Sequence, residues 1–115
     1  MNASRLLQLR PSIRQAIAAY RDRIAAQYAD EVVTVILYGS QARGHAHPES
    51  DIDLLVVTRQ DSPVLRQMLA DLAWDVQFEH HVIISDLVRS LDQWQQMQRE
   101  RFPFYQSIER EGVIL

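Results

Sequence analysis

Two carboxylates separated by a single residue, Asp51 and Asp53, are the side chains of this sequence best suited to chemistry. They precede an apolar run, residues 54–57, whose composition favours a β-strand. Because residues i and i+2 of a strand point to the same face, the two carboxylates would lie roughly 6–7 Å apart at the backbone. Two like charges at this spacing repel each other unless water or a cation compensates them. Paired carboxylates suit a hard divalent ion such as Mg²⁺, so the pair predicts a metal site.

A glycine and a serine lie upstream of these acids, in a position that suggests a phosphate site. Residues 32–38 form a nearly continuous β-branched and aromatic run, and Gly39 and Ser40 follow it directly. A glycine after a buried strand permits a sharp turn and a close approach of the backbone to a ligand. The N–H groups of such a turn, with the Ser40 hydroxyl nearby, can bind an anion. Transfer of a nucleotide from a nucleoside triphosphate requires a phosphate site of this kind beside a metal site.

The spacing of the two segments resembles that of the nucleotidyltransferase superfamily of DNA polymerase β. The shared pattern is Gly-Ser, ten residues and then Asp-x-Asp. In this sequence it reads Gly39-Ser40, residues 41–50 and Asp51-Ile52-Asp53, and the resemblance covers about residues 32–88. It implies the polymerase β-like palm fold and an enzyme that transfers a nucleoside monophosphate.

The resemblance also assigns residues to roles. It implies that Asp51 and Asp53 are catalytic and hold Mg²⁺, with two ions expected, and that ATP is the substrate. It places Gly39 and Ser40 at the nucleotide. Arg43 could bind phosphate through its planar guanidinium group, or it could be an ordinary surface arginine.

A third carboxylate completes the site in this superfamily, where it comes from a later strand, binds a metal and activates the acceptor hydroxyl. Our alignment of the predicted strand 82–88 puts Ser85 at that place. Asp86 is the neighbouring residue and a candidate catalytic acid, but strand alternation points it to the other face unless a bulge turns it. Asp75 and Glu79, at the end of the preceding helix, are poorer candidates. The departure at Ser85 bears on turnover more than on nucleotide binding.

The resemblance extends to a class of partner. Residues 103–112 look like the tail of bacterial stand-alone members, the minimal nucleotidyltransferases, which lack an acceptor-binding domain. Such members are often antitoxins paired with a helical HEPN-family RNase toxin. A HEPN toxin is therefore the partner that the resemblance implies.

The elements that must position these residues can be read from the hydrophobic pattern. We expect a single domain over residues 1–115, of the α/β (α+β) class, with a small mixed β-sheet and helices packed on it. The segment 39–50 is typical of a loop. The expected elements are helices at about 12–29 and 63–79, a helix capped by Ser90, a short helical turn after Pro103, and strands at 32–38, 51–57 and 82–88.

Composition excludes several other classes of protein. The chain has 115 residues, a formal charge of −3, no cysteine, and only arginine among its twelve Lys and Arg residues. These features argue against disulfides, Cys-ligated metals, lysine chemistry and strong nucleic-acid binding. No segment is apolar enough to predict a membrane span, and we expect a cytoplasmic location. The aromatic residues, Trp74 and Phe78 among them, could be packed in the core or could form a partner surface.

Three functions follow as alternatives. The first is an Mg²⁺-dependent transferase that moves a nucleoside monophosphate, AMP from ATP, to a hydroxyl of a partner protein such as a HEPN toxin. The second is a degenerate module that neutralises its partner by contact, which Ser85 favours. The third is a transferase acting on a small molecule such as an antibiotic, which the short chain disfavours. Either a homo-oligomer or a hetero-oligomer is compatible with the sequence.

Overall fold

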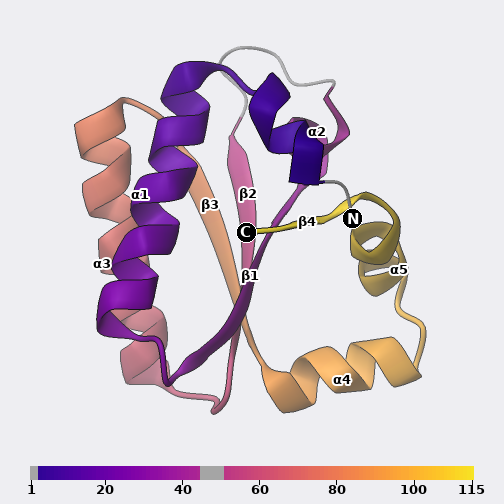
Figure 1. Cartoon of the computed structure of the whole chain (residues 1–115). Helices are drawn as coiled ribbons and strands as arrows, with labels where there is room; N and C mark the ends of the chain where they lie inside the picture. The colour runs from indigo at the N-terminus through magenta and orange to yellow at the C-terminus, as the bar shows by residue number, and fades with distance from the viewer. Residues whose placement is uncertain (1–2, 45–50) are drawn as a thin grey trace.

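The computed structural model describes residues 3–44 and 51–115, in which a mixed sheet carries helices on both faces (Figure 1). In chain order the elements are a 3₁₀ helix η1 (Ala3–Gln8), α1 (Pro11–Gln27), β1 (Val32–Tyr38), α2 (Gly39–Arg43), β2 (Ile52–Thr58), α3 (Pro63–His80), β3 (Ile84–Ser90), α4 (Leu91–Arg99), α5 (Pro103–Glu111) and β4 (Val113–Ile114). The predicted class, a small mixed sheet with helices packed on it, is confirmed.

The sheet has the strand order β3-β2-β1-β4. Strand β1 runs antiparallel to both β2 and β4, whereas β2 and β3 are parallel and are joined through α3. The end of β1 and the start of β2 meet at one end of the sheet, because Tyr38 pairs with Asp53. This antiparallel pairing brings the two halves of the sequence motif together.

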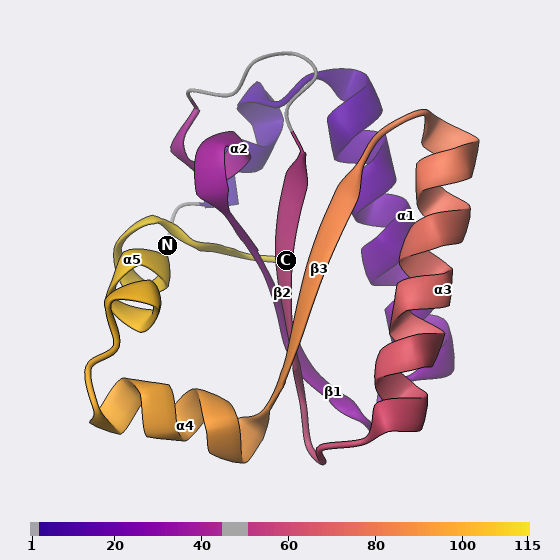
Figure 2. The ribbon, with the colours of Figure 1, turned by 180° about the vertical axis from the view of Figure 1, so that it is seen from behind.

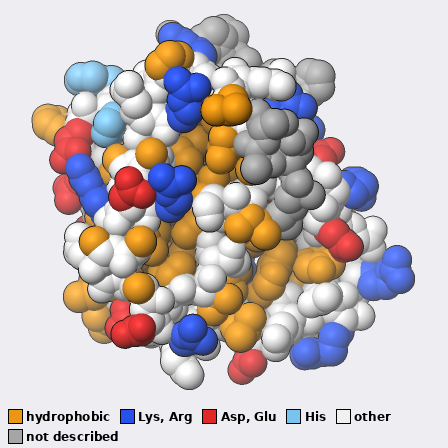
Figure 3. Space-filling view, in the orientation of Figure 1, with side chains coloured by type: hydrophobic (Ala, Val, Ile, Leu, Met, Phe, Trp, Pro, Cys, Tyr) orange, Lys and Arg blue, Asp and Glu red, His pale blue; other side chains and the backbone are white. Residues whose placement is uncertain are grey.

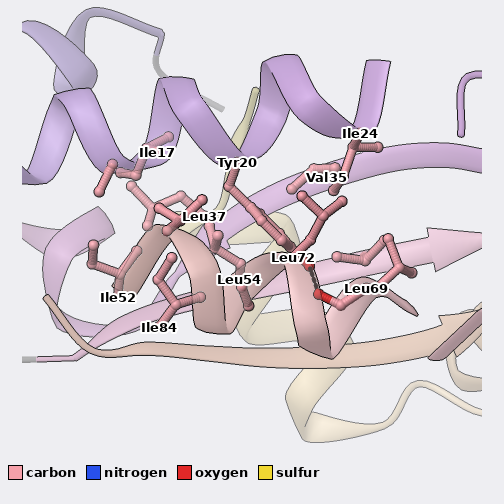
Figure 4. Close-up of a cluster of buried hydrophobic side chains, with 14 of the residues drawn as sticks. Ile17, Tyr20, Ile24, Val35, Leu37, Ile52, Leu54, Leu69, Leu72 and Ile84 are labelled. Atoms are coloured by element: carbon pink, nitrogen blue, oxygen red, sulfur yellow. Dashed lines mark hydrogen bonds between the residues drawn. The ribbon is translucent and has the colours of Figure 1, made fainter. Parts of the chain in front are cut away.

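Helices α1 and α3 cover one face of the sheet, and α4 and α5 lie against the other (Figures 1 and 2). The larger core lies under α1 and α3, where alternate residues of β1 and β2 meet the apolar sides of both helices (Figure 4). Tyr20 of α1 is fully buried there, and its hydroxyl donates a hydrogen bond to the Leu69 carbonyl of α3 at 3.3 Å. A smaller cluster on the other face contains Leu55 of β2 and Ile108 of α5.

Two serines begin helices as their sequence context predicts. Ser62, before the proline that opens α3, accepts a hydrogen bond from the Leu65 N–H at 3.1 Å. Ser90 and Gln93 form a reciprocal capping box at the start of α4, with distances of 3.2 and 2.9 Å. These bonds satisfy N–H groups that have no partner within the helix.

The structure corrects the expected elements in three places. Residues 39–43, expected as loop, form the short helix α2, while residues 45–50 of that segment lie outside the described part of the chain. The third strand lies at 84–90 rather than 82–88, because Ser90 ends the strand and also caps α4. Residues 113–114 form β4, since pairing with β1 places them beside Ile36 and Leu37.

The surface in the orientation of Figure 1 has hydrophobic side chains running down its middle, with Arg, Asp and Glu mainly to either side (Figure 3). Among the described residues, no helix has the length and apolar character that crossing a membrane requires.

Candidate functional site

Asp51 and Asp53 lie at the end of the sheet where β1 stops and β2 starts. Asp53 is the second residue of β2, half-buried between its strand neighbours Tyr38 and Ser85. It points to the same face as Leu55, which is the face that α5 covers. Asp51 precedes the strand and is exposed. At this end of the sheet, the carboxylate of Asp53 is therefore partly buried and that of Asp51 faces solvent.

Gly39 lies directly against the carboxylate of Asp53. A Cβ atom placed on Gly39 would be 2.2 Å from Asp53 Oδ2, well inside any allowed contact. Gly39 also has a φ of 73°, a left-handed conformation that disfavours residues with side chains. The sequence predicts that Gly39 allows close approach of a ligand. In the structure, its lack of a side chain also makes room for the Asp53 carboxylate.

Helix α2 turns away from this contact over five residues, Gly39–Arg43. Ser40 lies in its first turn and is half-buried. Gly44, with a φ of 77°, ends the helix, and its N–H is directed at the carbonyls of Ser40 and Gln41. Ser40 therefore follows the Gly39–Asp53 contact directly, in a short helix whose C-terminal end is capped by Gly44.

Arg43 joins α2 to α5 at the edge of the site. Its Nη1 lies 3.4 Å from Glu111 Oε2, in an ion pair whose partners are both partly exposed. Arg43 also lies close enough to Asp53 to lower the pKa of that acid. The structure thus places the charge of Arg43 near two carboxylates, those of Glu111 and Asp53.

The pKa of Asp53 is nevertheless raised above its ordinary value. Burial contributes most, the negative charge of Asp51 adds to it, and Arg43 offsets part of the rise. The repulsion between Asp51 and Asp53 that the sequence predicts is therefore present in the folded chain. A cation bound between the two acids would relieve it.

Tyr38 and Phe104 form the aromatic side of the site. Their rings meet edge to face, with centroids 5.3 Å apart and an interplanar angle of 85°. Burial raises the pKa of the Tyr38 hydroxyl, and the neighbouring carboxylate of Asp53 raises it further. Tyr38 is therefore neutral beside the acids and could act as a hydrogen-bond donor or as a packing surface.

The pairing of β2 with β3 places Ser85, not Asp86, beside the acids. The parallel register runs unbroken from Ile52 with Ile84 to Thr58 with Ser90, so the bulge that would turn Asp86 is absent from these paired residues. Ser85 pairs with Asp53 and is exposed, and its side chain shares the face of Asp53. Asp86 projects to the α1–α3 face, where burial raises the pKa of Tyr20 and the charge of Asp86 raises it further. The structure therefore does not bring Asp86 together with Asp51 and Asp53.

The two acids fit a hard divalent cation such as Mg²⁺. Both supply carboxylate oxygens at one end of the sheet. Burial contributes most to the raised pKa of Asp53, and a cation would compensate the repulsion from Asp51 that adds to it. Among the described residues there is no group of three or more His, Cys, Asp or Glu that could hold a metal ion. Mg²⁺ held by one or two carboxylates commonly takes its other ligands from water and from substrate phosphate oxygens.

The sequence matches a family model described as the nucleotidyltransferase domain over residues 17–114, which include every residue of the site. The chain belongs to this family. It is therefore a nucleotidyltransferase, from a family of enzymes that use a nucleoside triphosphate and a divalent metal.

One relative and two solved structures are similar to this nucleotidyltransferase. MJ0604 of Methanocaldococcus jannaschii, named as a candidate protein adenylyltransferase, is 28% identical over 101 residues, which cover 88% of this chain and 95% of the relative. The structure of a candidate minimal nucleotidyltransferase superposes with a TM-score of 0.58 at 23% identity, covering 90% of this chain and 95% of the other. A chain from a mutant form of the toxin–antitoxin pair MntA–HpeT gives a TM-score of 0.52 at 17% identity, covering 83% and 68%. Both structures share the fold of the nucleotidyltransferase.

Three residues of the site were not found from the sequence: Tyr38, Phe104 and Glu111. Tyr38 ends a strand as an ordinary aromatic residue, and its pairing with Asp53 depends on the strand register. Phe104 and Glu111 lie on α5, more than 50 residues beyond the acids in sequence. Only the packing of α5 on the sheet brings them to the site, so no local sequence signal could have identified them.

Proposed function

We propose that this nucleotidyltransferase transfers AMP from ATP, with Mg²⁺, to a hydroxyl group of a partner protein. The observation that supports the proposal is the contact between Gly39 and the Asp53 carboxylate, because it brings the turn that we expect to bind phosphate against one of the two acids that we expect to bind the metal. The protein adenylyltransferase name of MJ0604 supports a protein as the acceptor. The fold shared with a toxin–antitoxin chain supports a toxin as that protein, and a HEPN-family toxin is the class we propose.

The reaction forms a bond from the acceptor oxygen to the α-phosphorus of ATP and breaks the bond from that phosphorus to pyrophosphate, while the hydroxyl proton passes to a base. Asp51 and Asp53 would hold the ion, which when bound neutralises phosphate charge and polarises the α-phosphorus. Gly39 and Ser40 would bind phosphate oxygens through the first turn of α2. Arg43 would exchange Glu111 for a phosphate, to which its planar guanidinium group is well matched.

The identity of residue 85 favours a second candidate function. Ser85 occupies the strand position beside Asp53, and a serine hydroxyl is a far weaker base than a carboxylate. The loss of a general base typically lowers a rate by about 10²–10⁴-fold. A chain that binds Mg-ATP and its partner but transfers AMP slowly would neutralise the partner by contact.

The metal assignment is tested by calorimetric titration of ATP, with Mg²⁺ and with a chelator. We expect binding by the wild-type chain to require Mg²⁺, and this dependence to be lost when Asp51→Asn and Asp53→Asn are combined. The double variant should remain folded because it removes a repulsion between like charges. Asp92→Asn, an exposed acid on α4, is the matched control and should bind as the wild type does. Equal Mg²⁺-dependent affinity in the double variant would refute the assignment.

The choice between transferase and binding module is tested by mass spectrometry of the proposed partner, a purified HEPN-family protein from the same organism as this chain. After incubation with the chain and Mg-ATP, an added nucleoside monophosphate on that protein shows transfer. We expect Ser85→Asp to increase the modified fraction and Asp86→Asn to leave it unchanged, because only residue 85 shares the face of Asp53. Loss of transfer in Asp86→Asn, with no gain from Ser85→Asp, would show instead that Asp86 serves the reaction.

A further inference from the structure

Helix α3 has an apolar side that nothing in the described structure covers. Its inner side carries the buried residues of the main core. Its outer side carries Val64, Met68, Trp74 and Phe78, which are 67, 45, 68 and 79% exposed. With 3.6 residues per turn these four positions fall within about one third of the helix circumference, opposite the core side. Figure 2 shows α3 at the margin of the molecule, with α1 and β3 on its inner side.

The exposure of large apolar side chains to water is unfavourable unless another molecule covers them. A tryptophan and a phenylalanine one turn apart are largely in water, although both are commonly well buried in folded chains. Large exposed apolar groups gathered on one face typically mark an interaction site. The sequence left open whether Trp74 and Phe78 pack in the core or face a partner, and their exposure excludes the core.

The surface is hollowed at both ends. A cavity of about 540 Å³ opens beside Val64 and Met68, and a smaller one of about 200 Å³ is bounded by Trp74, Gln77 and Phe78. From Val64 to Phe78 the helix rises about 21 Å, which is roughly four turns of an α-helix. Side chains of a second helix lying along α3 could therefore enter both hollows.

Two carboxylates, Asp71 and Asp75, lie in the middle of this apolar sector. Both are exposed, and neither is in any of the ion pairs found among the described residues. Asp71 only accepts a hydrogen bond from Gln67, at 2.9 Å. We call the six residues Val64, Met68, Asp71, Trp74, Asp75 and Phe78 the α3 outer surface.

The charge on the α3 outer surface decides what kind of partner fits it. A second copy of this chain, docked helix to helix about a two-fold axis, would bring four carboxylates together in an apolar contact, where like charges are costly. A helix with arginine or lysine beside its own apolar stripe would pair with Asp71 and Asp75 instead. The surface is therefore complementary to a cationic amphipathic helix of another protein.

The α3 outer surface also has a direct route to the candidate site. The C-terminal end of α3, which carries Phe78, leads through His81 into β3, whose Ser85 is paired with Asp53. Strand β3 is the last strand of the sheet on this side, with α3 over one face and Asp53 on the other. A protein seated on α3 could extend past the β3 edge to the face of Asp53.

We propose that the α3 outer surface docks a helix of the acceptor protein, bearing an apolar stripe flanked by cationic side chains, and so presents the acceptor hydroxyl at the site. This rests on the proposed function for the identity of the partner. The apolar contacts of Trp74 and Phe78 provide most of the affinity. The carboxylates of Asp71 and Asp75 provide specificity for a partner with cationic side chains.

The test measures, by calorimetry, the dissociation constant between the full chain and the HEPN-family protein used in the transfer assay. We expect Trp74→Ala combined with Phe78→Ala to weaken binding roughly 100-fold, because exposed aromatic residues of this kind are typical hot spots. Asp71→Arg combined with Asp75→Arg should weaken it at least about tenfold and reverse the direction of its salt dependence, because attraction to cationic side chains becomes repulsion. Leu7→Ala combined with Val33→Ala, which truncates exposed apolar residues elsewhere, is the matched control and should leave binding unchanged.

The outcomes separate this proposal from the proposed function. If the α3 variants lose binding while the wild-type chain binds but transfers no AMP, the docking surface is supported and the transferase is not. If the α3 variants bind as tightly as the wild type, or if the wild type does not bind this protein, the docking proposal is wrong whatever the transfer assay shows. Sedimentation that gives a wild-type dimer, converted to monomer by the aromatic variant, would assign the surface to a second copy instead. Unchanged Mg-ATP binding in each variant verifies that it is folded.

Discussion

At the scale of single residues, the site depends on Gly39 leaving room for Asp53. The absence of a side chain at Gly39 lets the Asp53 carboxylate lie against the turn that begins α2, and the positive φ of the glycine directs the chain into that helix. A side chain at this position would displace the Asp53 carboxylate and would also strain the backbone by about 1–2 kcal/mol.

Gly39→Ala is therefore expected to destabilise the chain by about 1–2 kcal/mol and to abolish Mg²⁺-dependent ATP binding. Gly44→Ala is the matched control, because Gly44 has nearly the same positive φ but faces the Arg5 side chain rather than an acid of the site. It should lose similar stability in urea unfolding and retain ATP binding in calorimetry. Equal ATP affinity in the two variants would contradict the role given to the contact with Asp53.

At the scale of elements, helix α5 packs over the face of the sheet that carries Asp53 and contacts residues on the border of the site. Phe104 packs edge to face on Tyr38, and Glu111 pairs with Arg43 of α2. The aromatic contact fixes α5 on the sheet, whereas an exposed ion pair contributes only about 0–1 kcal/mol to stability. The Arg43–Glu111 pair is therefore more important for where Arg43 points than for how stable the chain is.

Glu111→Gln is expected to leave the melting temperature nearly unchanged and to strengthen ATP binding, since Arg43 no longer has to leave a carboxylate to bind a phosphate. Arg43→Ala should weaken ATP binding. Adding Glu111→Gln to this variant should not restore the affinity for ATP, because the arginine that would benefit is gone. Calorimetry on the three variants and the wild type gives the comparison. If Glu111→Gln weakens ATP binding, Glu111 holds Arg43 in its binding position rather than competing for it.

At the scale of the whole molecule, Asp86 makes stability depend on pH. It lies on the α1–α3 face near Tyr20, and burial raises its pKa above the ordinary value of 3.8. The folded chain therefore binds this proton more tightly than the unfolded chain does. Ionisation of Asp86 lowers the free energy of unfolding as the pH rises from the ordinary pKa through the raised pKa of the folded chain.

Asp86→Asn is therefore expected to raise the free energy of unfolding at pH 7, with a gain that shrinks as the pH falls through the raised pKa of Asp86 towards its ordinary value of 3.8. Urea unfolding at both pH values measures it. Asp92→Asn, which removes an exposed acid from the first turn of α4, should instead cause a small loss, because a negative charge there favours the helix. A destabilised Asp86→Asn at pH 7 would show that the charge has a stabilising partner.

The sequence by itself determined those parts of the protein that depend on local rules. The alternation at residues 51–57, the continuous run at 32–38 and the serine caps predicted strands and helix starts, because strand periodicity and capping involve only near neighbours. The Gly-Ser and Asp-x-Asp segments identified the family for a similar reason, since both are short and their spacing is constant. The acids and the turn could thus be named before any fold was known.

Only the tertiary structure decided what depends on contacts between distant segments. Strand register placed Ser85 beside Asp53 and turned Asp86 to the other face, because pairing and not sequence position fixes which residues of two strands are neighbours. Residues 39–43 became a helix, and Trp74 and Phe78 were left in water. An aromatic residue on a helix with two apolar sides reveals its role only when packing has chosen which side faces the sheet.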